Sequence, residues 1–101
     1  MHLVELFLPL TYPNGDAVPE AIFQLIESEL TEVFGGVTVY ARGSARGLWK
    51  TDHSLGADAL VVFEVMTKDL DKDWWKEFRH RTQALLHQEE LLVRATVSER
   101  L

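Results

Sequence analysis

The fold is decided by residues 59–66, which read Ala-Leu-Val-Val-Phe-Glu-Val-Met. A run that is almost entirely apolar and rich in β-branched residues is typical of a strand covered on both faces. Residues 3–8, Leu-Val-Glu-Leu-Phe-Leu, have the same design, with Glu5 as their single charge just as Glu64 is in the first run. We therefore expect these two stretches to be the central strands of one sheet.

Two helical patterns and two alternating stretches account for most of the remaining chain. Pro19 suits the first position of a helix, and behind it apolar residues recur at helical spacing: Ile22, Ile26, Leu30, Val33 and Phe34. Gly35-Gly36 would end this helix. Residues 68–73 supply candidate capping residues and acidic residues for the start of a second helix. In this helix we expect Trp75 at the edge of the buried face and the following residues to point inward: Trp74, Phe78, Thr82, Leu85 and Leu86. Residues 37–42 and 91–98 alternate between apolar and polar side chains, which predicts half-buried strands.

The order strand, helix, strand, strand, helix, strand predicts an α+β protein with a ferredoxin-like β-α-β-β-α-β arrangement over residues 1–101. Right-handed crossovers would put both helices on one face of a four-stranded antiparallel sheet. The expected strand order is 4-1-3-2, with the two most apolar strands in the centre. Gly43 and Gly47 would form bulges or bends before residues 48–50, for which a continuation of the strand is the expectation, and residues 51–58 would form a loop. An open α/β unit is the alternative, although two long helices and four strands leave little room for one.

The composition narrows the classes of function. The chain has 101 residues, a formal net charge of −6 and no cysteine. The negative net charge disfavours a surface that binds the phosphates of a nucleic acid. The absence of cysteine excludes disulfides and metal clusters held by thiolates. The first residues lack the features of a signal peptide, and no apolar run approaches the roughly 20 residues of a membrane helix. We therefore expect a cytoplasmic protein that binds neither nucleic acid nor membrane, with no metal and no cofactor indicated.

Three short motifs carry a resemblance to known proteins. They are Phe34-Gly35-Gly36-Val37-Thr38, the isolated Trp49, and Gln88-Glu89-Glu90-Leu91-Leu92-Val93. Through them, most of the chain resembles small bacterial proteins of unknown function that are expected to have a ferredoxin-like fold. The layout is also similar to the dimeric α+β barrel superfamily, which includes cofactor-free monooxygenases, lactone isomerases and haem-degrading enzymes. The resemblance implies the fold and no particular activity.

Strand parity assigns the side chains to the two faces of the predicted sheet. The helix-facing set is uniformly apolar: Val4, Leu6, Leu8, Val37, Val39, Val61, Phe63, Val65, Leu91, Val93 and Ala95. The open face would carry a mixed set: Leu3, Glu5, Phe7, Thr38, Tyr40, Arg42, Leu60, Val62, Glu64, Met66, Leu92, Arg94 and Thr96. Too many of these residues are apolar for a sheet face left in water, so we expect a homodimer in which a second copy covers it.

The charged residues of the open face have two interpretations. In the first, Glu5–Arg94 and Glu64–Arg42 are cross-strand ion pairs inside an interface, because leaving a buried charge unpaired costs several kcal/mol. In the second, Glu64 or Glu5 is a catalytic general base, since a carboxylate in an apolar pocket is suited to proton abstraction. Such a pocket would have these ligand-binding residues: Phe7, Tyr40, Arg42, Trp49, Met66 and Arg94.

The two interpretations predict functions of different classes. The first predicts an interaction module or small-molecule-binding module that uses the open face. The second predicts a cofactor-free enzyme, monooxygenase-like or isomerase-like, that acts on a small apolar metabolite. Away from the sheet, His53 beside Asp52 is a candidate base, although a histidine in a loop is more typically solvated. Gln88 and Glu89 are candidates to line the mouth of a pocket.

Overall fold

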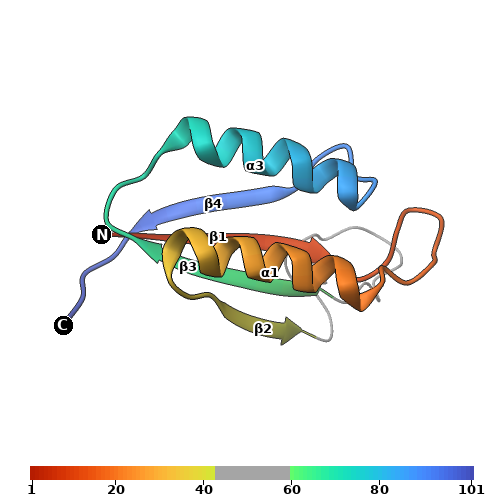
Figure 1. The fold of residues 1–101 in the computed structure, drawn as a ribbon, viewed down its shortest axis with the longest axis horizontal. Coiled ribbons are helices and arrows are strands. Elements are labelled where there is room, and N and C mark those ends of the chain that lie inside the picture. The colour runs from red at the N-terminus through yellow and green to blue at the C-terminus, as the bar shows by residue number, and fades with distance from the viewer. Residues whose placement is uncertain (43–59) are drawn as a thin grey trace.

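The computed structural model describes residues 1–42 and 60–101 of the chain. In this part, the strands β1 (His2–Pro9), β2 (Thr38–Arg42), β3 (Leu60–Thr67) and β4 (Leu92–Val97) form one antiparallel sheet in the order β2-β3-β1-β4. The helices α1 (Glu20–Phe34) and α3 (Lys72–Leu85) connect the strands in the order β1-α1-β2-β3-α3-β4 (Figure 1). The predicted ferredoxin-like α+β arrangement and strand order are therefore confirmed.

The two most apolar strands, β1 and β3, occupy the centre of the sheet, as their sequences predict. Their register pairs Val4 with Val65 and Leu6 with Phe63. All four of these side chains are buried. Because alternate side chains of a strand point to opposite faces, this register also places Glu5 opposite Glu64 on the other face.

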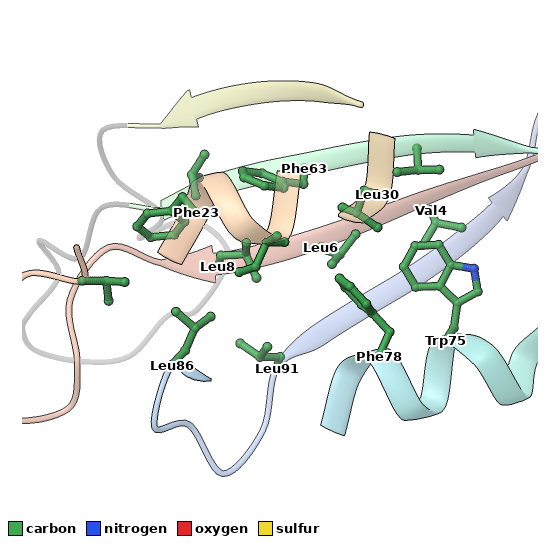
Figure 2. Packing of buried hydrophobic residues seen from close by; sticks show 14 residues of the cluster. Val4, Leu6, Leu8, Phe23, Leu30, Phe63, Trp75, Phe78, Leu86 and Leu91 are labelled. Carbon is green, nitrogen blue, oxygen red and sulfur yellow. The ribbon is translucent and has the colours of Figure 1, made fainter. Parts of the chain in front are cut away.

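The core lies between the helices and one face of the sheet. Figure 2 shows Trp75 and Phe78 of α3 directed at β1, and Phe23 and Leu30 of α1 on the same side of the sheet. The buried cluster joins these elements through Val4, Leu6, Leu8, Val18, Phe23, Ile26, Leu30, Val61, Phe63, Val65, Trp75, Phe78, Leu86 and Leu91. The predicted helix-facing side is thus confirmed for the central strands. The prediction is wrong for Val39 and Ala95 on the edge strands: both are exposed and lie outside the buried cluster beneath the helices.

Helix α1 begins and ends close to the predicted residues. Pro19 is the N-cap rather than the first helical residue, and Gly35 is the C-cap, with a left-handed φ of 86°. The Gly35 N–H donates to the carbonyl oxygen of Thr31 at 2.7 Å, which satisfies one of the free carbonyls at the helix end. The predicted apolar stripe is correct at its centre, but Phe23 is buried and Val33 is exposed.

Helix α3 is rotated relative to the prediction. Asp71 caps it by accepting a hydrogen bond from the Trp74 N–H at 3.0 Å. Trp75 is buried and Trp74 half-buried, the reverse of the prediction, because the buried stripe of α3 runs through Trp75, Phe78 and Thr82. Both tryptophan rings contact Phe34 of α1: Trp75 stacks on it with ring centroids 5.2 Å apart, and Trp74 meets it edge-on at 5.1 Å. Leu85, predicted to point inward, is exposed in the last turn.

A short turn joins β1 to α1 and is held by its own hydrogen bonds. The Gly15 N–H donates to the Tyr12 carbonyl at 2.9 Å, and the Tyr12 N–H donates to the Asp16 carbonyl at 2.8 Å. The Val18 N–H closes the turn on the Leu10 carbonyl at 2.9 Å. Gly15 adopts a φ of 97°, which suits glycine in a tight turn.

No helix in the described ranges is long and apolar enough to cross a membrane.

Candidate functional site

The open face of the sheet is the side away from α1 and α3, and its centre is apolar. Phe7, Leu60 and Val62 are buried there and form a cluster separate from the main core. Around them, large side chains stay exposed: 48% of Met66, 45% of Tyr40 and 38% of Leu92.

A row of polar residues crosses the open face, one residue from each strand. The register places Thr38 of β2 opposite Glu64 of β3, Glu64 opposite Glu5 of β1, and Glu5 opposite Arg94 of β4. We call these four residues the polar row. Two like charges directly opposite each other on neighbouring strands repel, so the central pair of carboxylates must be stabilised by its neighbours.

Arg94 stabilises the first carboxylate. Its Nε donates to Oε1 of Glu5 at 2.9 Å, so the cross-strand ion pair predicted from the sequence is confirmed. The guanidinium also lies over the ring of Phe7, 4.9 Å from the centroid, where a cation is attracted to the negative face of the ring. The side chains are 51% exposed for Arg94 and 21% exposed for Glu5, so water still reaches the pair.

Tyr40 is the partner of the second carboxylate. Its hydroxyl donates to Oε1 of Glu64 at 3.2 Å. The negative charge of Glu64 raises the pKa of Tyr40 above its usual value, and the hydrogen bond acts in the same direction. Arg42, the predicted partner of Glu64, pairs instead with Leu60, at the far end of β2 from Thr38. The register does not support the predicted Glu64–Arg42 pair, and the side chain of Arg42 lies outside the described part of the structure.

Three of the predicted site residues line two separate hollows, whereas Glu5, Tyr40 and Arg94 are not among the described lining residues of either. Glu64 and Met66 lie in a hollow of about 480 Å³ at one end of the open face, with Leu3, Phe34, Gly35, Gly36, Val37 and Thr38. Phe7 lies in a second hollow of about 490 Å³ at the other end. Trp49 and His53 lie outside the described residues, so the structure does not place them relative to either hollow.

We call the second hollow the turn pocket, because the turn between β1 and α1 forms one of its walls. The described residues that line it are Phe7, Pro9, Thr11, Tyr12, Pro13, Gly15, Leu60, Gln88, Glu90, Leu91 and Leu92. Gln88 therefore lies at a pocket, as predicted from the sequence. Its predicted neighbour at the mouth, Glu89, is not among these lining residues, whereas Glu90 is.

His87 beside the turn pocket has an unusual backbone conformation. Its φ is 57°, the left-handed region that glycine normally occupies after a helix. The N–H of Gln88 donates to the Gln83 carbonyl at 2.9 Å and that of His87 to the Ala84 carbonyl at 3.2 Å, which is the Schellman pattern of a helix end. A side chain at this position costs about 1 kcal/mol of backbone energy.

The imidazole of His87 has a defined partner in spite of that cost. It stacks on the ring of Tyr12, with centroids 4.3 Å apart and an interplanar angle of 21°. The stack connects the end of α3 to the turn. The sequence offers one signal of it, a helix end that lacks the usual glycine, but only the fold shows that Tyr12 lies opposite.

The arrangement as a whole defines a small ferredoxin-like α+β domain with two hollows on or beside its open face. In the described ranges, no three His, Asp or Glu side chains gather in a way that could hold a metal ion. Comparison of the chain with models of protein families, with curated proteins and with solved structures finds no match in any of the three. The function is therefore argued from the geometry.

Proposed function

We propose that this chain is an interaction module that forms a homodimer by covering its open face with a second copy. The observation that carries the proposal is the Glu5–Arg94 pair, at 2.9 Å in the middle of a sheet face with exposed apolar side chains. Compensating a charge lowers the cost of burying the apolar face around it, because an uncompensated buried charge costs several kcal/mol. On the same face, Glu64 accepts a hydrogen bond from the neutral hydroxyl of Tyr40. The chain compensates Glu5 itself, before any partner arrives.

The exposed side chains around the polar row supply the contact area. Three different strands contribute exposed side chains, namely Tyr40 from β2, Met66 from β3 and Leu92 from β4. The contact area is therefore distributed over the face and not confined to one small patch. Aromatic residues and methionine are enriched in the cores of protein interfaces. A two-fold dimer is the commonest soluble oligomer, and it would bring the same face of both copies together.

The test is the oligomeric state of a matched pair of variants. Sedimentation of the full chain at micromolar concentration should give the mass of a dimer. Met66→Glu puts a charge on the open face and should shift the chain to monomer, whereas Leu25→Glu puts the same charge on an exposed position of α1 and should leave the dimer unchanged. A monomer for the unaltered chain at these concentrations would contradict the proposal.

A second candidate function is a cofactor-free enzyme in which Glu64 is the general base. One observation favours it: among the described residues, the hydrogen-bond partner of Glu64 is the neutral hydroxyl of Tyr40, not a cation. Glu64 also lies in a hollow with Met66 and Leu3, which gives a small apolar molecule a surface to contact. A base needs a free carboxylate close to the proton that it removes.

Exchange of carbon-bound hydrogen tests this second candidate. The chain would be incubated in heavy water with small ketones and lactones, and deuterium uptake beside the carbonyl group would be followed by proton NMR. Uptake that Glu64→Gln abolishes and Glu5→Gln leaves intact supports a base at Glu64. Equal uptake with and without protein over the whole panel contradicts it.

A further inference from the structure

We propose that the turn pocket is a binding site for a small organic amine, a positively charged nitrogen carried on a compact apolar group. The site lies at the end of the sheet, and its wall and rim come from segments outside the polar row. Its floor shares Phe7 and Leu60 with the open face, so a second copy on that face would cover part of the pocket. The proposal does not rest on the proposed dimer, and titration of the probes into Met66→Glu, the variant expected to be monomeric, keeps the two results apart.

The floor of the turn pocket is apolar and buried. Phe7, Leu60 and Leu91 are each less than a tenth exposed, and Pro9 lies beside them where β1 ends. The volume of about 490 Å³ falls in the range of pockets that hold small molecules, roughly 300 to 1,000 Å³. Such a floor favours a ligand with a compact hydrocarbon body, which gains free energy by leaving water.

The rim of the turn pocket offers acceptors and negative charge. Glu90 contributes an exposed carboxylate. The side-chain amide of Gln88 uses its nitrogen to donate to the Leu86 carbonyl at 3.2 Å, which leaves its oxygen as an acceptor. Thr11 and Tyr12 add hydroxyl groups. A ligand that ends in an ammonium group matches this rim, whereas a carboxylate would be repelled by Glu90.

The wall of the turn pocket is fixed before a ligand arrives. The turn carries its own backbone hydrogen bonds, and Asn14 adds one by accepting from the Asp16 N–H at 2.9 Å. Tyr12 is then held from behind by the imidazole of His87. Glycine would satisfy the helix end equally well, but it would lack the imidazole that stacks on Tyr12. Holding a binding wall in place favours binding, because a preformed site loses less entropy when the ligand arrives.

Three matched probes test the ligand class. Phenethylamine, 3-phenylpropionate and 2-phenylethanol share a compact apolar body and differ in the charge of the end group. Titration of each into the labelled full chain, followed by amide NMR, should show saturable shifts at Gly15, Gln88 and Leu91. The amine should bind at least about tenfold more tightly than the carboxylate, a difference equivalent to about 1.4 kcal/mol.

Variants assign the preference to the proposed groups. Glu90→Gln should remove most of the advantage of the amine over the alcohol, whereas Glu89→Gln, the same change at a neighbouring exposed residue, should leave it unchanged. His87→Gly keeps the helix end favourable and removes the stack, so it should weaken binding of all three probes in a chain that stays folded. Equal affinity for the three probes, shifts centred on the polar row, or no saturable binding at millimolar amine would each overturn the proposal.

Discussion

Glu5 and Glu64 lie directly opposite each other on the two central strands, yet only Glu5 is paired with a cation in the described part of the chain. Arg94 completes the pairing of Glu5 from the next strand, and the neutral hydroxyl of Tyr40 donates to Glu64. The two carboxylates therefore have different surroundings although they interrupt their strands in the same way. This difference supports the proposal that Glu64 and not Glu5 would contact a ligand.

The effects of removing either member of the Glu5–Arg94 pair should be unequal. Arg94→Met leaves two facing carboxylates without a cation, whereas Glu5→Gln removes their repulsion together with the ion pair. Arg94→Met should therefore be the more destabilising change in urea unfolding, and high salt should reduce the difference because it screens the repulsion. Equal losses at low salt would contradict this account of the polar row.

A double-mutant cycle measures the pair itself. If the pair were fully buried, breaking it would cost roughly 3–5 kcal/mol. The observed exposure of Arg94 lowers the expected coupling in the free chain to about 0.5–1 kcal/mol. The pair of Arg81 and Glu29 between the helices provides a comparison: its glutamate is more exposed, at 36%, but its guanidinium donates two hydrogen bonds to the carboxylate, at 3.1 and 2.9 Å. Its coupling free energy should also lie at about 0.5–1 kcal/mol.

Phe63→Ala tests which face of the sheet the helices cover. Phe63 is 1% exposed and lies in the main core, so the change should reduce the free energy of unfolding by roughly 3–5 kcal/mol. Val97→Ala, at an exposed position of the edge strand β4, should change it by less than about 0.5 kcal/mol. A loss below about 1 kcal/mol for Phe63→Ala, within the range of surface substitutions, would mean that the two faces are reversed.

The sheet could be predicted because its signals are local and redundant. The apolar runs of β1 and β3 and their single glutamates determine which strands are central and which face each side chain takes. The rotation of α3 could not be predicted in the same way. Trp74 and Trp75 are adjacent and equally apolar, and both rings contact Phe34, which lies far away in the sequence. The pattern along α3 therefore does not say which of the two is buried.

The candidate site was predictable in part for similar reasons. Parity places Glu5, Glu64 and Arg94 on the open face, and strand order places them on neighbouring strands. Only the register of the structure shows that Glu5 lies directly opposite both of the others. The register of β2 decides whether Thr38 or Arg42 faces Glu64, and alternation does not determine that register because it repeats every two residues. The contact of His87 with Tyr12 joins two loops, for which no periodicity exists.

His87 provides a test of the helix end that is independent of ligand binding. His87→Gly and His87→Ala both remove the imidazole, but only glycine is free of the steric cost of a left-handed backbone. The glycine variant should therefore be more stable than the alanine variant by about 1 kcal/mol in urea unfolding. Equal stability of the two variants would show that the backbone at residue 87 is not held in the left-handed conformation.

Tyr40 provides a test of the environment of Glu64 through pH. The charge of Glu64 raises the pKa of Tyr40 in the folded chain above its value in the unfolded chain. The folded state therefore holds the phenolic proton more tightly, so this contribution to stability is fully present below the unfolded pKa, about 10. It should be lost as the pH rises through the folded pKa of Tyr40.

The ultraviolet absorbance of tyrosinate measures that pKa directly. The chain contains two tyrosines, so Tyr12→Phe isolates the signal of Tyr40. In that background, Glu64→Gln should lower the pKa of Tyr40, because the charge that is the largest cause of the shift is removed. Glu5→Gln should lower it less, since Glu5 contributes the smallest of the causes. If Glu64→Gln left the pKa of Tyr40 unchanged, the carboxylate of Glu64 would not lie beside the Tyr40 hydroxyl in solution, and the hydrogen bond between them would be absent.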